Sequence, residues 1–301
     1  MASPIVRPAP RRSCLSVPAS SDRKLQKAVS MLVDEVVIDL EDAVAVPAKE
    51  QARTAALAAL EGWSGPGVAV RVNAPRTPWC HLDVIALAQL KEMPHSIVVP
   101  KVESAGDIAF IERLLDGSEL ASGRSRPLRI QALIETAIGL SAVQEIAAAS
   151  SRLDSLILGY ADLSASLGGA PSLDAWLPAQ HAVLLAARAN GLQAIDGPFL
   201  GVAVDEPFLA AATRAHELGF DGKWAIHPSQ LQSLEVLFSS TEAELKQAHA
   251  VIEALAQAQD GSGDGAVLLD GQMIDEAVRV SALGVLARAG AVEQATRTPT
   301  P

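Results

Sequence analysis

The sequence predicts a (β/α)8 TIM barrel followed by a C-terminal helical extension. Short apolar runs recur along the chain, and helix-like stretches of roughly ten to fifteen residues separate them. Polar or charged residues stand where these runs end, as where Val36–Ile38 runs into Asp39 and Val68–Val70 runs into Arg71. In such a barrel the chemistry sits at the carboxyl ends of the strands. These strand ends are therefore the expected catalytic rim.

The elements follow in chain order. Residues 1–12 contain several prolines and arginines and are expected to be a disordered tail. The barrel is expected to span 13–240. Residues 241–294 are expected to form a helical segment that packs on its own barrel or on a neighbouring subunit, and 295–301 a second disordered tail. The predicted strands are 13–17, 36–40, 68–73, 96–100, 128–134, 155–158, 193–196 and 222–226. The helices between them are predicted near 24–33, 47–60, 82–91, 105–115, up to 149, 175–190, 206–218 and from 229, with a polar loop at 117–127.

Composition excludes several classes of protein. Hydrophobic residues make up 49% of the chain and aromatic residues 3%, so a large aliphatic core is expected. The net charge of −11 argues against nucleic-acid binding and against binding to acidic membranes. Cys14 and Cys80 have no metal-ligand spacing and are interpreted as reduced thiols. No charge-free apolar segment has the roughly 18 residues of a membrane span, and the N-terminus lacks a secretory apolar region, so a cytoplasmic location is expected.

Two carboxylates are candidates for a metal site. Glu135 ends the fifth predicted strand and Asp162 lies just beyond the sixth. Adjacent strands lie about 4.8 Å apart, so these side chains can share one hard cation. Mg²⁺ commonly takes one or two carboxylates and completes its octahedron with water and substrate. The alternative is that each acid caps the helix that follows it, for Asp162 a short helix at 164–167.

Arg71 ends the third predicted strand and is a candidate for holding a carboxylate or polarising a carbonyl oxygen. The alternative is a plain ion pair with Asp42 or Glu41. Strand alternation places Asp39 and Glu41 on one side and Asp42 on the other. One of these acids is expected to position Arg71 and a second to hold metal-bound water, and Asp42 is the predicted catalytic acid. His227 either touches ligand or serves backbone hydrogen bonding.

These residues lie in motifs that resemble the HpcH/HpaI aldolase and citrate lyase β-subunit family of CoA-ester lyases. The resemblance spans about 13–290 in the family's order. Within it, Thr77–Trp79 and the run from 222 to 230 are most similar to malyl-CoA and β-methylmalyl-CoA lyases. The motifs are DLEDAV (39–44), RVN (71–73), VPKVES (99–104), IETAIG (134–139), GYADL (159–163), DGPF (196–199), GKWAIHPSQ (222–230) and GQMID (271–275).

The resemblance implies a TIM barrel with Mg²⁺, Mn²⁺ being the alternative cation, in a homotrimer or hexamer. Glu135 and Asp162 match its metal ligands, and Arg71 matches a residue that contacts substrate oxygens. Asp275 matches an acid/base residue that a neighbouring subunit lays over the active site.

Other positions match the binding of the CoA thioester. Lys27 matches a basic residue near the CoA phosphates, and Ala161, Ile226 and His227 match positions that line the substrate. The chain departs from malyl-CoA lyases at Ser16 and Ser21, where an aromatic residue and an arginine are usual, with Arg23 as a substitute. The stretch after Gly168 is also shorter, as in citrate lyase β-subunits.

The resemblance therefore implies a Mg²⁺-dependent lyase. It would reversibly cleave a 3-hydroxyacyl-CoA of the malyl-, β-methylmalyl- or citramalyl-CoA type into an acyl-CoA and a 2-oxo acid. Three alternatives stay open. They are a malate-synthase or thioesterase outcome on the same scaffold, a citryl-thioester lyase that acts on a carrier protein, and a non-catalytic assembly protein. The complete set of Arg71, Glu135, Asp162 and Asp275 disfavours the last of these. The only expected partners are the CoA thioester, the 2-oxo acid and further copies of the chain.

Overall fold

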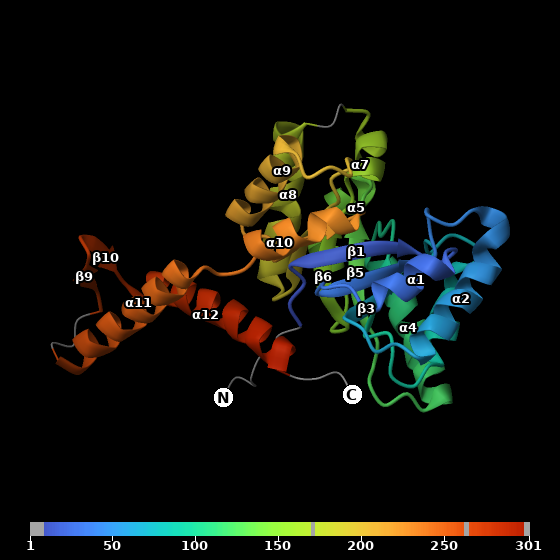
Figure 1. The fold of residues 1–301 in the computed structure, drawn as a ribbon, viewed down its shortest axis with the longest axis horizontal. Coiled ribbons are helices and arrows are strands. Elements are labelled where there is room, and N and C mark those ends of the chain that lie inside the picture. The colour runs from blue at the N-terminus through green and yellow to red at the C-terminus, as the bar shows by residue number, and fades with distance from the viewer. Residues whose placement is uncertain (1–8, 170–171, 262–264, 298–301) are drawn as a thin grey trace. The chain divides into compact units, whose positions relative to one another are not determined.

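Eight parallel strands close into a barrel in chain order, with β1 pairing with β8 (Figure 1). The computed structural model describes residues 9–169, 172–261 and 265–297. The predicted (β/α)8 fold class is confirmed. The strands are β1 Ser13–Pro18, β2 Glu35–Asp39, β3 Gly67–Arg71, β4 Ser96–Val99, β5 Arg129–Ile134, β6 Leu153–Leu158, β7 Gln193–Asp196 and β8 Gly222–Ala225.

Helices follow the strands and surround the barrel (Figure 1). The expected single helix after β5 is two short ones, because the chain bends at Ala142. The helices of the barrel are α1 Asp22–Ala28, η1 Val46–Ala48, α2 Lys49–Glu61, α3 Cys80–Ala88, α4 Ala105–Ser122, α5 Ala137–Ser141, α6 Val143–Ala147, α7 Tyr160–Leu167, α8 Leu173–Ala189, α9 Glu206–Leu218, η2 Pro228–Gln230 and α10 Leu231–Leu237.

The predicted loop at 117–127 is wrong over its first half, because α4 continues to Ser122. The N-terminus of α4 has a capping box. The Ser104 side chain accepts a hydrogen bond from the backbone N–H of Asp107, and the Asp107 carboxylate accepts one from the backbone N–H of Ser104. The helix ends at Gly123, which is in the left-handed conformation at φ 67°. Buried positions keep helical spacing through Glu119, whose carboxylate accepts a hydrogen bond from the backbone N–H of Leu128 at 2.7 Å. Tertiary contacts thus override the low helix propensity of Gly117.

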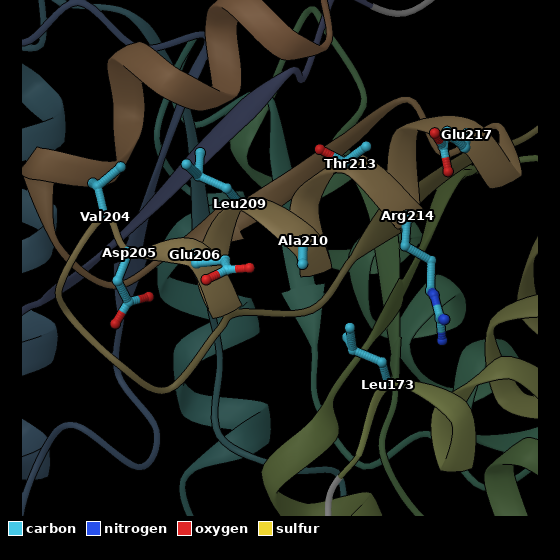
Figure 2. Close-up of a pocket in the computed structure, with 9 residues that line it drawn as sticks. All are labelled: Leu173, Val204, Asp205, Glu206, Leu209, Ala210, Thr213, Arg214 and Glu217. Carbon is cyan, nitrogen blue, oxygen red and sulfur yellow. The ribbon is translucent and has the colours of Figure 1, made fainter.

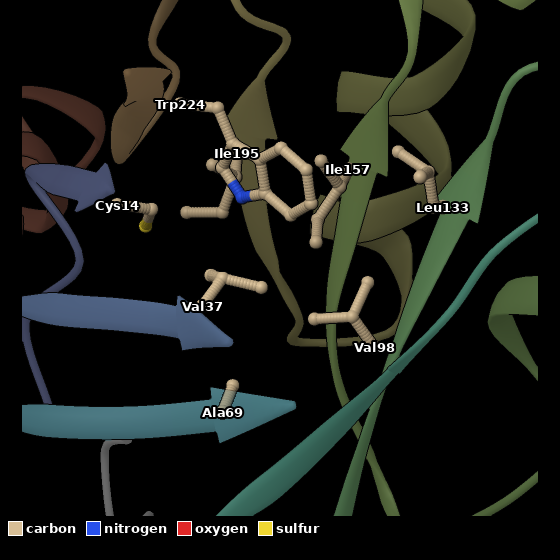
Figure 3. Close-up of a cluster of buried hydrophobic side chains, with 8 residues drawn as sticks. All are labelled: Cys14, Val37, Ala69, Val98, Leu133, Ile157, Ile195 and Trp224. Carbon is tan, nitrogen blue, oxygen red and sulfur yellow. The ribbon is translucent and has the colours of Figure 1, made fainter. Parts of the chain in front are cut away.

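One apolar side chain from each strand meets in the middle of the barrel (Figure 3). This middle layer is almost completely buried. Side chains alternate between the two faces of a strand, so residues two positions before or after a layer member point into the barrel as well. The layer therefore sets which residues face inward at both ends. Its members are Cys14, Val37, Ala69, Val98, Leu133, Ile157, Ile195 and Trp224.

A buried polar network closes the amino-terminal end of the barrel. Arg11 donates to Glu35 at 3.0 Å, to Gln193 at 2.6 Å and to Asp154 at 3.0 Å. Gln131 donates to Glu35 at 2.9 Å. Arg11 is only 5% exposed, because its charge is compensated by two carboxylates.

The predicted tail at 1–12 is therefore wrong at its last two residues. Arg12 forms an ion pair with Asp34 at 2.7 Å, and the compact unit of the barrel begins at Arg11. Residues 1–8 lie outside the described part of the chain.

A second buried ion pair lies outside the barrel wall. Asp196 has the opposite strand parity to Ile195 of the middle layer, so its side chain points away from the barrel interior. It accepts hydrogen bonds from Lys223 and from the hydroxyl of Tyr160, and the Lys223 ammonium also donates to the carbonyl of Gly197 at 2.6 Å. Gln180 on α8 donates to the Tyr160 hydroxyl at 2.7 Å. The network ties α7 and α8 to the last two strands.

The second compact unit begins at Phe238 and is described by itself. It contains α11 Glu242–Gly261, the antiparallel strands β9 Val267–Leu269 and β10 Gln272–Ile274, and α12 Glu276–Arg297. Its own apolar core includes Val251, Leu255 and Ile274. The predicted tail at 295–301 is helical up to 297, and 298–301 lie outside the described residues. Within the described ranges, no helix has the length and apolar character needed to cross a bilayer.

We expect the Lys223→Met variant to lower the free energy of unfolding by about 3–5 kcal/mol, because it leaves the buried Asp196 carboxylate without its ammonium partner. Urea denaturation followed by circular dichroism measures this loss. The double variant Asp196→Asn/Lys223→Met removes both charges and should regain part of the stability. A double variant less stable than Lys223→Met would contradict this account of the pair.

Candidate active site at the carboxyl ends of the strands

Arg71 is fixed at the end of β3 by two carboxylates from β2 and the turn after it. Its Nε and Nη2 atoms donate to the two oxygens of Asp39 at 2.8 and 2.5 Å. Its Nη1 lies 3.1 Å from Oε2 of Glu41. Burial opposes its charge, but pairing with Asp39 and Glu41 raises the pKa of Arg71 above its usual value. A guanidinium has five N–H donors, so three remain after the fork to Asp39.

Lys49 stabilises the acidic turn after β2 through hydrogen bonds to its backbone. The Lys49 ammonium donates to the carbonyls of Leu40 at 2.8 Å and Glu41 at 2.7 Å, and it lies 5.6 Å from the ring centroid of Trp79. Asp39 accepts hydrogen bonds from the backbone of Glu41 and Ala43. These contacts explain why the DLEDAV motif is followed by a lysine on the next helix.

Glu135 follows β5 and is 3% exposed. It does not cap the next helix, since Thr136 is the N-cap of α5 and accepts from the backbone of Gly139. Burial, followed by the negative charges of Glu41 and Asp162, raises the pKa of Glu135 to about 8. The capping alternative for this residue is therefore wrong, and its carboxylate lies in a site that favours a nearby positive charge.

Asp162 lies in the first turn of α7, which begins at Tyr160 and has no side-chain cap. The short helix anticipated at 164–167 is thus longer, and Asp162 does not cap it. Its carboxylate is partly exposed. Gly159, which precedes the helix, lies against Glu135: a Cβ atom there would be 2.6 Å from Oε2 of Glu135. The chain needs glycine at this position to bring β6 and the two acids close together.

Lys101, which the sequence analysis did not select, joins these acids. Its backbone N–H donates to Oε1 of Glu135 at 2.9 Å, and its Nζ lies 3.5 Å from Oδ2 of Asp162. The same ammonium contacts Glu41 and lies 3.3 Å from Asp42. Its position after the apolar run 97–99 was the available signal, because the other candidates also follow strand ends.

The donor set fits a hard divalent cation. Oε2 of Glu41 is buried and has no hydrogen-bond partner, despite its 3.1 Å approach to Arg71. The described part of the chain has no group of three or more His, Cys, Asp or Glu side chains arranged around a common metal position. Two carboxylates are nevertheless enough for Mg²⁺, which keeps several water or substrate ligands. Glu135 and Asp162 are the residues that would hold it.

Asp42, the acid of its motif that is expected to be catalytic, does not contact Arg71. Its side chain is 59% exposed and lies 3.3 Å from Lys101. Asp39 forms the fork with Arg71, and Glu41 is the second buried acid. Alternation explains the difference, because Asp39 shares the inward parity of Val37 and Asp42 does not.

The residues expected to line the substrate differ in how they are placed. His227 caps η2, its Nδ1 accepting from the backbone of Ser229 at 3.2 Å, which is the backbone role left open by its sequence position. The N–H groups of Ile226 and His227 both donate to Oε1 of Gln230. Ala161 is in the first turn of α7, close to Asp162 in sequence. Lys27 is exposed on α1.

Asp275 belongs to the second compact unit. Its Oδ1 accepts hydrogen bonds from the backbone N–H groups of Ala277 at 3.0 Å and Val278 at 3.2 Å, so it is the N-terminal cap of α12. The side chain is exposed. The capping role neither requires nor excludes an acid/base role.

A separate open hollow lies along α9 and contains none of the predicted site residues (Figure 2). Its walls include Leu173, Val204, Leu209 and Arg214. Arg214 forms an ion pair with Asp174 at 2.9 Å. The candidate site is therefore the charged cluster at the strand ends and not this hollow.

The fold and the charged cluster define a (β/α)8-barrel enzyme whose site lies at the carboxyl ends of its strands. Residues 12–228 match the model of the HpcH/HpaI aldolase/citrate lyase family. The protein belongs to the HpcH/HpaI aldolase/citrate lyase family.

Three relatives show how far the likeness extends. The chain is 34% identical to an L-malyl-CoA/beta-methylmalyl-CoA lyase of Cereibacter sphaeroides, over 88% of this chain and 90% of that protein. It is also 34% identical to a (3S)-malyl-CoA thioesterase of the same species, over 94% and 96%. A crystal structure of CitE from Mycobacterium tuberculosis with magnesium, acetoacetate and coenzyme A matches with a TM-score of 0.75 and 31% identity, over 95% of this chain and 100% of that one. The expected family and the carbon–carbon lyase class are confirmed.

We expect the Gly159→Ala variant to lose about 1–3 kcal/mol of unfolding free energy, because the new methyl group overlaps Glu135. The matched control is Gly117→Ala in α4, where nothing lies within 4 Å of the added Cβ. That change should stabilise the protein by about 0.4–1 kcal/mol. Urea denaturation of both variants checks the prediction, and equal effects of the two would show that Gly159 is not in close contact with Glu135.

Proposed function

We propose that the protein is a Mg²⁺-dependent CoA-ester lyase. It reversibly cleaves a 3-hydroxyacyl-CoA of the malyl-, β-methylmalyl- or citramalyl-CoA type into an acyl-CoA and a 2-oxo acid. The main support is the charged cluster at the strand ends of the barrel. In it, Lys101 contacts Glu135, Asp162 and Glu41, and Glu41 in turn contacts Arg71. The names of the relatives, which are lyases and a thioesterase acting on such esters, support the substrate class.

The reaction requires stabilisation of negative charge at two places. A base takes the hydroxyl proton, the O–H electron pair forms the carbonyl of the 2-oxo acid, and the C–C bond breaks to leave the enolate of the acyl thioester. Carbon then takes up a proton. Glu135 and Asp162 would hold Mg²⁺, which would supply Lewis acidity toward the oxygens of the oxo acid.

The chain's own residues would provide the remaining stabilisation. Arg71 is held in one orientation by the fork to Asp39, so its remaining N–H groups need no reorganisation before they donate to a developing oxyanion. The uncapped first turn of α7, with Ala161, offers further backbone donors to a carboxylate. Asp275 of a neighbouring subunit would deliver the proton to carbon.

A direct test incubates the purified protein with malyl-, β-methylmalyl-, citramalyl- and citryl-CoA, with and without Mg²⁺, and follows products by mass spectrometry. The expected products are an acyl-CoA and a 2-oxo acid. No cleavage of any of these esters would overturn the proposal.

A second candidate function is hydrolysis of the malyl-type thioester. It is favoured by the equal identity of the chain to the (3S)-malyl-CoA thioesterase. The same incubation separates the two functions, because a thioesterase releases free CoA and the hydroxy diacid, whereas a lyase keeps the thioester bond intact. A thiol reagent detects free CoA directly.

Activity should require the carboxylates of Glu135 and Asp162. Glu135→Gln and Asp162→Asn remove a negative charge without changing shape, and each is expected to lower kcat/KM by several orders of magnitude while the far-ultraviolet circular dichroism stays unchanged. The control is Glu217→Gln on α9, an exposed acid away from the cluster. Full activity after exhaustive chelation would exclude a metal-dependent reaction.

We further propose a homotrimer or hexamer in which Asp275 acts on the active site of a neighbouring copy. The proposal rests on the family resemblance of 271–275 and on the exposure of Asp275. Asp275→Asn and Arg71→Ala variants should each be inactive. Mixed under conditions of subunit exchange, they should regain partial activity, because some sites then combine an intact Arg71 with an intact Asp275. If mass spectrometry shows exchange and no activity returns, Asp275 does not act in trans.

A further inference from the structure

Lys101 contacts both proposed metal ligands, and it does so with two different groups. Its backbone N–H donates to Glu135 and its ammonium lies 3.5 Å from Asp162. The ammonium also contacts Glu41 and lies 3.3 Å from Asp42. It therefore stands where three carboxylates converge.

The backbone around Lys101 is specialised for this position. Lys101 has φ 51°, a left-handed conformation that costs a residue with a side chain roughly 1–2 kcal/mol. The next residue packs tightly: the carbonyl of Val102 would lie 2.2 Å from a Cβ on Gly139, so only glycine fits there. Strain of this kind persists where the surroundings hold it in place.

The left-handed turn also explains the direction of the side chain. Val98 belongs to the middle layer, so simple alternation would point residue 100 inward and residue 101 outward. The turn at Lys101 breaks this alternation, and the ammonium contacts the acids at the strand ends instead. The side chain is 33% exposed, so it has an open path away from the acids.

The charges of the cluster are balanced only in part. The charge of Arg71 is compensated by Asp39, through its fork, and by Glu41 at 3.1 Å. The ammonium of Lys101 contacts Glu41 and lies 3.3 Å from Asp42 and 3.5 Å from Asp162, so three carboxylates share it. These three carboxylates would repel one another more strongly if that ammonium were absent.

We propose that Lys101 is a tethered cation that occupies the carboxylate cluster in the metal-free protein and gives up its place near Asp162 when a divalent cation binds. The inference rests on the proposed metal site at Glu135 and Asp162. The ammonium of Lys101 is a compact point charge on a flexible stem. It can therefore keep its contacts with Glu41 and Asp42 while it moves away from Asp162. Lys101 is in this sense a positioning residue: it keeps the ligands together before the metal arrives and competes with it.

The test measures Mg²⁺ and Mn²⁺ binding by isothermal titration calorimetry, with no substrate present. Lys101→Met and Lys101→Gln remove the competing charge, and both should bind Mg²⁺ at least tenfold more tightly than the wild-type protein. Lys101→Arg keeps a positive charge and should stay within about threefold of the wild-type Kd. Lys91→Met, which removes an exposed lysine that donates to the carbonyl of Ser122, is the matched control and should leave Kd unchanged.

Thermal unfolding gives an independent measurement. Without metal, Lys101→Met should melt below the wild-type protein, because the acids have lost their ammonium, and Mg²⁺ should raise its Tm by more than it raises the wild-type Tm. Equal or weaker Mg²⁺ binding by both neutral variants would overturn the proposal and make Lys101 an ordinary support of the ligands. A wild-type protein that binds neither cation would overturn the metal site itself, and with it the exchange.

Discussion

The middle layer of the barrel is the constraint on which the site depends. Each strand contributes one buried apolar side chain to it, from Cys14 on β1 to Trp224 on β8. Strand side chains alternate with a period of two. A slip of one residue in any strand would therefore turn its layer member out of the barrel interior and leave the apolar layer incomplete. The same alternation places Asp39 above Val37, Arg71 above Ala69 and Glu135 above Leu133. Packing of the apolar layer thus aims the charged groups, and Arg71 lies 5.7 Å from the ring of Trp224 at the top of that layer.

Strand parity also separates the charges of the candidate site from charges that only support the fold. Arg71 and Glu135 share the inward parity of the layer and meet other charges inside the barrel. Asp196 also stands at a strand end, but it has the opposite parity and forms a buried pair with Lys223 under α7 and α8. A buried pair with all its oxygens bonded has little left to offer a ligand. The acids around Lys101 differ, because one buried oxygen of Glu41 accepts no hydrogen bond and Asp162 is partly exposed.

Much of the fold was predictable from the sequence, since apolar runs, their spacing and the strand-end charges are all local patterns. The positions of Glu135 and Arg71 at the strand ends were predictable for the same reason. The choice between Asp39 and Asp42 was not, because it depends on which member of β2 enters the layer. Lys101 was missed because a left-handed backbone at a lysine has no sequence signal, and alternation alone points it outward.

The ends of elements were predicted less well than their existence. Arg11 and Arg12 look like part of a charged tail until their partners Glu35, Asp154 and Asp34 are placed beside them by distant strands. α4 runs through Gly117 because its buried face continues to Glu119. Both differences come from contacts between residues far apart in the chain, which no local pattern contains.

The polar network around Arg11 and Gln131 has a consequence for how a long ligand is recognised. Together with the apolar layer it plugs the barrel, so the interior is no passage, and a molecule can approach the charged cluster from one end alone. Under the proposed function, only the acyl terminus of a thioester would reach Arg71 and Glu135, and the bulky nucleotide portion would stay outside. Selectivity for the acyl group and affinity for the nucleotide portion of the thioester are then separable. Substitutions inside the rim can change the acyl selectivity without changing that affinity.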